Sequence, residues 1–95
     1  MPRSTAVIAT GHASKYLQQL CKHFAHKVSV EFDTERGRID FPFGECGLRA
    51  GENALTIDCT TKTDEDIERA QNVVFDHLKR FAWREELEAN WSVSV

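Results

Sequence analysis

The hydrophobic residues of this chain change their spacing twice, and these changes constrain the fold more than any other feature. Between His12 and Lys27 they recur at helical intervals, three and four positions apart, which places them on one face of a helix. From Val28 to Thr60 they alternate with polar residues, which is typical of strands with one buried face. Helical spacing returns between Thr63 and Phe81. The chain therefore predicts a strand region between two helices.

The alternating region predicts three strands separated by turns rich in Gly, Asp and Asn. In the middle strand the apolar positions are odd up to Phe43 and even from Cys46 onward. A shift of one residue is what a β-bulge produces, so we predict a bulge at Phe43, Gly44 and Glu45. The three predicted strands cover residues 28–32, 38–50 and 55–60.

Both ends of the chain carry further strand-like patterns. Residues 5–9 predict a first strand, and Thr10 is expected to cap the first helix. At the other end, alternation over residues 86–95 predicts a final strand. A continuation of the second helix through Trp83 and Leu87 competes with that strand, and the sequence leaves residues 83–95 open between the two.

The predicted order of elements is β-α-β-β-β-α-β, in a single α+β domain that covers residues 1–95. Two helices with one apolar face each can bury those faces against a mostly antiparallel sheet. We therefore expect a two-layer sandwich with both helices on one face of the sheet. No apolar run approaches the about 20 residues that a membrane-spanning helix needs, so no membrane association is expected.

Composition and motifs favour a binding or accessory module over an enzyme. The net charge of −3 argues against nucleic acid as the usual partner. No phosphate-binding, zinc-protease or nucleophile-elbow motif is present, so we predict no catalytic residue and no cofactor. The three cysteines, Cys21, Cys46 and Cys59, are odd in number and lack a CxxC spacing. We expect them to be reduced, in a cytoplasmic protein.

One face of the first predicted helix is polar and rich in His and Lys. This stripe suits either plain contact with solvent or an acidic protein partner, and its members are His12, Lys15, Gln19, Lys22 and His26. His23 and His26 are three residues apart and form weak candidates for half of a metal site. Cys21 lies on the opposite, apolar face and cannot complete such a site, so no metal site is predicted.

The end of the second helix and the last strand offer a second candidate surface. Arg80, Trp83, Arg84 and Trp91 are of the types that are enriched in protein interfaces, and the alternative is a hydrophobic corner that packs under the last strand. The last strand could also leave a free sheet edge that a second copy extends. We therefore expect a homodimer.

His77 lies on the apolar stripe of the second helix and has two interpretations. A histidine in a core is usually hydrogen-bonded to a backbone carbonyl or a carboxylate. The alternative is a ligand-linked or metal-linked redox accessory protein, with a pocket lined by Cys46, Cys59 and His77.

Three blocks of sequence carry a family resemblance. They are TGHASKYLQQLCKHFAHK at residues 10–27, GRIDFPFGEC at 37–46 and HLKRFAWREEL at 77–87, followed by Trp91. In their order and their span of nearly the whole chain they resemble the bacterial domain of unknown function 2218 family. Gly11 departs from the Pro usual beside the capping Thr, which affects only helix initiation. The resemblance implies no catalytic residue, and it implies an association with iron or siderophore metabolism.

Overall fold

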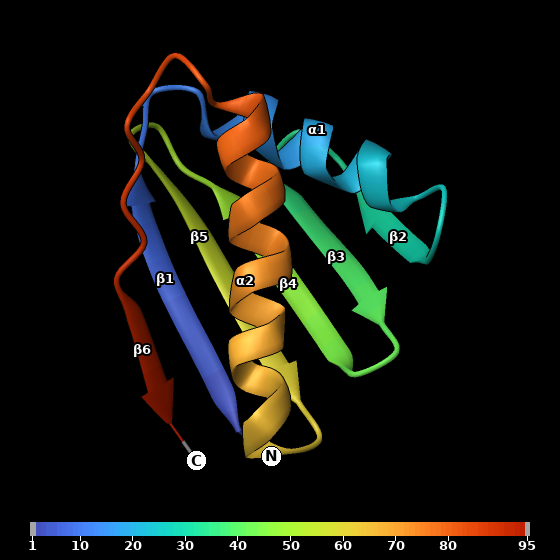
Figure 1. Ribbon diagram of the computed structural model, residues 1–95. Helices are drawn as coiled ribbons and strands as arrows, with labels where there is room; N and C mark the ends of the chain where they lie inside the picture. The colour runs from blue at the N-terminus through green and yellow to red at the C-terminus, as the bar shows by residue number, and fades with distance from the viewer. Residues whose placement is uncertain (1, 95) are drawn as a thin grey trace.

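The computed structural model describes residues 2–94, which form six strands and two helices (Figure 1). Neither helix in this part of the chain has the length and apolar content that a membrane crossing would require. In chain order the elements are β1 (Arg3–Ala9), α1 (Ala13–Phe24), β2 (Ser29–Phe32), β3 (Arg36–Phe41), β4 (Gly44–Ala50), β5 (Ala54–Thr61), α2 (Asp64–Phe81) and β6 (Trp91–Ser94).

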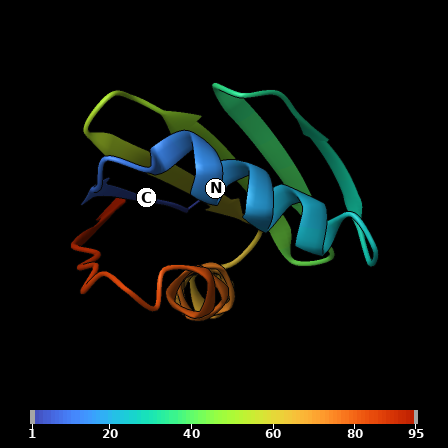
Figure 2. The same cartoon turned by 90° about the horizontal axis from the view of Figure 1, so that it is seen from above.

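The strands form one antiparallel sheet in the order β2-β3-β4-β5-β1-β6. Consecutive hairpins build β2 to β5, β1 is added beside β5, and β6 is added antiparallel to β1 at the edge of the sheet. Both termini therefore lie at the same side of the molecule (Figure 1). Seen from above, α1 and α2 cover the same face of the sheet (Figure 2). The predicted α+β class, with two layers and both helices on one face, is confirmed.

The core lies between that face of the sheet and the apolar stripes of the two helices. Alternate strand residues point toward the helices because successive side chains of a strand point to opposite faces. The buried apolar residues are Ala6, Ile8, Ile39, Cys46, Leu48, Leu55, Ile57 and Cys59 in the sheet, Ala13, Tyr16, Leu17, Leu20, Cys21 and Phe24 in α1, Ile67, Ala70, Val74 and Leu78 in α2, and Ala82 directly after α2.

The predicted bulge at Phe43, Gly44 and Glu45 is wrong. Pro42 and Phe43 form a two-residue turn between β3 and β4, and Phe41 pairs directly with Gly44 across it. Residues paired across an antiparallel ladder share a face, so a two-residue turn shifts the buried positions from odd to even just as a bulge does. The predicted middle strand is therefore two strands, and the sheet gains one strand over the prediction.

The two helices begin in different ways. Thr63 caps α2, since its hydroxyl accepts a hydrogen bond from the backbone N–H of Asp66 at 3.3 Å. Thr10 does not cap α1, which begins at Ala13. Its hydroxyl accepts from the backbone N–H of His12 at 3.1 Å, two residues along, and forms a turn that precedes the helix.

The open choice between helix and strand after α2 is resolved for most of that segment. The helix ends at Phe81, which excludes its continuation through Trp83 and Leu87. The predicted final strand is confirmed over Trp91–Ser94, but residues 82–90 are neither helix nor strand. The prediction for Val95 lies outside the described residues.

Candidate functional site

A hollow of about 500 Å³ lies where the start of α1 meets the end of α2. The C-terminal end of α2 reaches α1 at the top of the molecule in Figure 1. The volume of the hollow falls within the range of about 300–1,000 Å³ that is usual for small-molecule sites. The hollow is lined by His12, Lys15, Tyr16 and Gln19 from one side, and by Phe81, Trp83, Arg84 and Glu85 from the other.

Hydroxyl groups hold the Glu85 carboxylate in this hollow. The Tyr16 hydroxyl donates to one carboxylate oxygen, and the Thr10 hydroxyl lies 3.1 and 3.3 Å from the two oxygens. The Tyr16 hydrogen bond, with help from Thr10 and the charges of His12 and Lys15, lowers the pKa of Glu85. Burial and the contact with Glu85 raise the pKa of Tyr16 to about 12. Glu85 is therefore ionised and already partnered within the chain.

The cations around the hollow have no such partner. Lys15 and Arg84 form no ion pair with any residue between positions 2 and 94. The Arg84 guanidinium lies over the Trp83 ring, 4.7 Å from its centroid. The Trp83 side chain is 73% exposed, the most exposed large apolar side chain among the described residues. A cation and an aromatic ring are therefore presented to solvent side by side.

The structure combines parts of the two surfaces predicted from the sequence. His12, Lys15 and Gln19, from the stripe on α1, line the hollow together with Trp83 and Arg84. The remaining members of both sets are not in its lining: Lys22, His26 and Arg80 are exposed elsewhere, and Trp91 is half-buried in β6 against the core.

Sequence reasoning did not identify the contact between Tyr16 and Glu85. Helical spacing places Tyr16 on the apolar face of α1, and it is buried there with 4% of its surface exposed. No spacing could have revealed its partner, because the two residues are 69 positions apart. Only the approach of the segment after α2 toward α1 brings them together.

Replacement of Tyr16 by Phe should raise the pKa of Glu85 toward its ordinary value. The variant removes the donor that most strongly stabilises the carboxylate, and Thr10 remains as the second donor. A titration of the Glu85 side-chain carbonyl carbon by NMR measures this directly. Thr10→Val should give a smaller shift in the same direction, and an unchanged Glu85 titration in Tyr16→Phe would show that the hydrogen bond is absent in solution.

His23 and His26, the candidates for a metal site, and His77, the candidate for a pocket, do not line the hollow. His77 donates from Nδ1 to the backbone carbonyl of Val73 at 2.6 Å, as the core interpretation predicts. Its ring lies 4.8 Å from that of His23, centroid to centroid. Burial and the neighbouring charge of His77, with smaller contributions from nearby cations, lower the pKa of His23. His26 is exposed in the turn that follows α1.

Neither a metal centre nor the alternative redox pocket is assembled from these side chains. Between positions 2 and 94, no three His, Cys, Asp or Glu side chains are placed to hold a metal ion together. His77 contacts the rings of His23 and Phe24, whereas Cys46 and Cys59 contact each other. The two cysteines are 1% and 0% exposed, so they line no open pocket.

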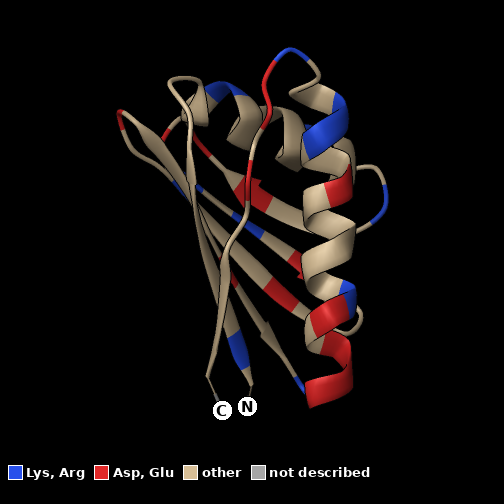
Figure 3. Cartoon of the chain, turned by 60° about the vertical axis from the view of Figure 1, so that its left-hand side comes forward, with Lys and Arg blue, Asp and Glu red and all other residues tan. Residues whose placement is uncertain are grey.

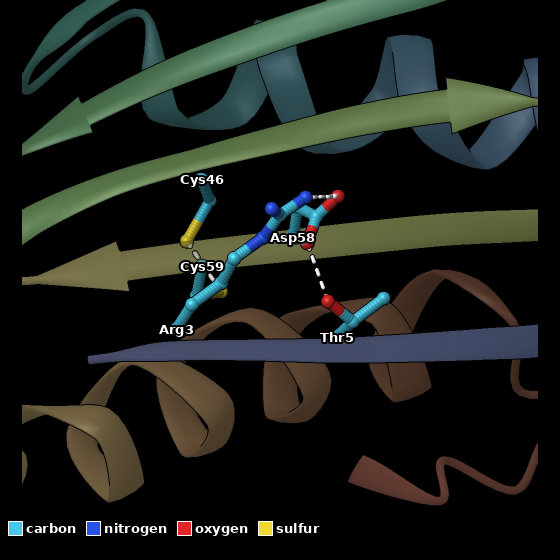
Figure 4. A network of polar contacts seen from close by, with 5 residues as sticks. All are labelled: Arg3, Thr5, Cys46, Asp58 and Cys59. Carbon is cyan, nitrogen blue, oxygen red and sulfur yellow. Dashed lines mark hydrogen bonds and ion pairs between the residues drawn. The ribbon is translucent and has the colours of Figure 1, made fainter. Parts of the chain in front are cut away.

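The face of the sheet that no helix covers carries a polar network. Arg3 binds the Asp58 carboxylate through two hydrogen bonds of 2.9 and 3.0 Å, and the Thr5 hydroxyl donates to the same carboxylate (Figure 4). Arg3 is the main cause of the lowered pKa of Asp58. Since each charged group already has its partner, this network joins β1 to β5 and offers no free reactive group.

Comparison with known proteins gives a family match and a structural relative. Residues 5–92 match the family described as "Uncharacterized protein conserved in bacteria (DUF2218)". The NMR structure of PA4090 from Pseudomonas aeruginosa is 40% identical, with a TM-score of 0.82, and the match covers 97% of this chain and 96% of that one. No curated protein matches. These descriptions name no activity, so the association with iron or siderophore metabolism has no support from them.

Proposed function

The chain belongs to the bacterial DUF2218 family, and we propose that it is a non-enzymatic module that binds an acidic segment of another protein. The binding surface is the hollow between α1 and the end of α2, with Lys15, Trp83 and Arg84 as its main contacts. The observation that carries the proposal is that Lys15 and Arg84 have no ion-pair partner among residues 2–94 and lie beside an exposed indole.

The chemistry of these groups suits a carboxylate-bearing chain. A guanidinium presents parallel N–H donors that match the two oxygens of a carboxylate. Trp and Arg are also the residues that contribute most often to the energy of protein interfaces. Because Glu85 is held by Tyr16 and Thr10, it does not neutralise the Arg84 guanidinium through an ion pair.

The distribution of charge supports an acidic partner in spite of the net charge of −3. Within α2, acidic residues gather at the start, at Asp64, Glu65 and Asp66, and the last turn carries Lys79 and Arg80, with the acids of residues 85–88 in the segment that follows (Figure 3). The 18 residues of α2 span about 27 Å, which exceeds the screening length of about 8 Å at physiological salt. The acids at the start of α2 therefore contribute little to the potential at the hollow.

A binding measurement with a model peptide tests the proposal. The probe is a fluorescein-labelled peptide of alternating Glu and Ala, and the control is the same peptide with Lys in place of Glu. We expect fluorescence anisotropy to show binding of the acidic peptide alone, weakened as salt rises from about 0.05 to 0.5 M. Equal binding of both peptides, or no binding of the acidic peptide at low salt, would contradict the proposal.

We also propose that the protein forms a homodimer through the outer edge of β6. This strand is at the end of the sheet and pairs with β1 along its other edge. Its Val93 side chain is 56% exposed, and an unpaired edge strand can accept a strand from a second copy. Light scattering should give a dimer for the full chain and a monomer after removal of residues 89–95. A monomeric full chain, or a truncated chain that remains dimeric, would refute this assembly.

We further propose a cytoplasmic location. All three cysteines are free and buried, at Cys21, Cys46 and Cys59. Thiols of a small domain persist in a reducing compartment, whereas secreted domains of this size usually contain disulfides. Fractionation of the producing cells, followed by detection of the protein, tests the location.

A further inference from the structure

Cys46 and Cys59 lie directly opposite each other in the β4–β5 hairpin. They are partners in the antiparallel register of the two strands, and their Sγ atoms are 2.7 Å apart (Figure 4). Both side chains lie on the face of the sheet that the helices cover, and both are fully buried. This Sγ–Sγ separation is shorter than an ordinary van der Waals contact. Two carbon atoms in contact are about 3.5–4.0 Å apart, and two sulfur atoms, which are larger, are farther apart still.

We propose that Cys46 and Cys59 form an oxidisable pair that closes to a cross-strand disulfide, with a low-molecular-weight disulfide such as oxidised glutathione as the oxidant. Directly opposed residues of an antiparallel pair have Cα atoms about 4.5 or 5.5 Å apart. Both separations fall within the range of about 4.4–6.8 Å that a disulfide spans. The bond can therefore form without a change in strand register.

The third cysteine is not placed to compete for this bond. Cys21 lies on α1, where its Sγ occupies the space above Gly37, 2.7 Å from the position that a Cβ would take there. Its pKa is raised to about 11 by burial. The geometry thus selects one pairing of the three that three cysteines allow.

The reaction balances as two successive exchanges. The thiolate of one cysteine attacks a sulfur of oxidised glutathione, which forms a mixed disulfide and releases one glutathione thiolate. The second cysteine, as its thiolate, then attacks the protein sulfur of the mixed disulfide and releases the second glutathione. The two protein thiols lose two protons and two electrons in total, and two molecules of reduced glutathione carry them away.

Burial determines how fast this exchange proceeds. The hydrogen bond with Cys59 and burial raise the pKa of Cys46, so the Cys46 thiol stays protonated while the hairpin is closed. The oxidant must wait for a local opening of β4 from β5, and the second exchange then follows rapidly because the partner thiol is adjacent. We therefore expect slow oxidation that speeds up under mild denaturing conditions.

Trypsin separates the three cysteines and gives a direct test. Cleavage after Lys and Arg places Cys21 in peptide 16–22, Cys46 in peptide 39–49 and Cys59 in peptide 50–62. After incubation of the native protein with oxidised glutathione, non-reducing mass spectrometry should show the loss of two hydrogen atoms. Peptides 39–49 and 50–62 should be linked, and the thermal unfolding midpoint should shift upward relative to the reduced protein.

Matched variants and a denatured control make the result decisive. Cys21→Ala should oxidise as the parent protein does, whereas Cys46→Ser and Cys59→Ser should stop at a mixed disulfide with glutathione. Where these Ser variants do not fold, the peptide map of the parent protein decides alone. A native protein that keeps its mass while the protein unfolded in guanidinium oxidises would overturn the proposal, and so would a link to peptide 16–22.

Discussion

Gly44→Ala should lower the free energy of unfolding by about 3 kcal/mol, the upper part of the range for inserting atoms into a packed site. A Cβ at Gly44 would lie 2.3 Å from the Thr60 carbonyl oxygen and 2.8 Å from the Thr61 Cα atom. Both are backbone atoms of β5, which cannot move aside as the end of a side chain can. The substitution must therefore push β4 away from β5 at the pair of Gly44 and Thr61, next to the turn between β3 and β4.

Gly47→Ala is the matched control, because it adds the same methyl group to the same strand. The nearest atom to a Cβ at Gly47 is the Asp58 carbonyl oxygen, at 4.0 Å. We expect a change of less than about 1 kcal/mol, in the stabilising direction, since Ala restricts the unfolded chain more than Gly does. Urea denaturation followed by circular dichroism measures both variants, and equal effects would show that β4 and β5 do not approach as described.

Reversal of the charges of Lys15 and Arg84 should have the largest effect on binding. Lys15→Glu combined with Arg84→Glu should weaken binding of the Glu-Ala peptide by about tenfold or more, equivalent to about 1.4 kcal/mol. Both new carboxylates would repel the peptide at the same hollow. Arg84→Glu also removes the only guanidinium in the lining of the hollow.

The control for this variant must have the same net charge. Arg36→Glu combined with Lys62→Glu meets that condition, since both side chains are exposed and neither lines the hollow. Its affinity for the peptide should stay within about twofold to threefold of the parent protein at about 0.15 M salt, where distant charges are screened. If both double variants lose affinity equally, net charge and not the hollow attracts the peptide.

The layers of the fold could be predicted because each rests on local periodicity. The helical spacing in residues 13–24 identified the buried face of α1 in full, from Ala13 to Phe24. Alternation identified the buried face of β5, at Leu55, Ile57 and Cys59. Apolar faces of this kind leave few arrangements that bury all of them, and a two-layer sandwich is one of those few.

The hairpin between β3 and β4 could not be predicted from the same signal. A bulge and a two-residue turn shift the buried positions by the same amount, so periodicity does not distinguish them. Phe43 also looked like a core residue of a strand, whereas it lies in the turn with its ring stacked on Phe41 at 5.1 Å. Position 44 requires a glycine because the backbone of β5 lies where a Cβ would be, and that contact exists only in the folded sheet.

The candidate site was predicted in parts, because its two sides come from distant segments. The stripe on α1 and the aromatic and basic residues after α2 were each recognised by composition. Their union in one hollow depends on where the end of α2 meets α1, which no local pattern specifies. The pairing of Cys46 with Cys59 was likewise not predicted, because it depends on the register of the β4–β5 hairpin.

The most direct test of the binding surface is an NMR titration of the ¹⁵N-labelled protein with the Glu-Ala peptide. We expect chemical shifts to change at the start of α1, at residues 81–85 and at the Trp83 indole N–H, and the Trp91 indole N–H in β6 to stay unchanged. Shift changes confined to the uncovered face of the sheet, around Arg3 and Asp58, would contradict the account, as would an unperturbed Trp83 indole at saturating peptide.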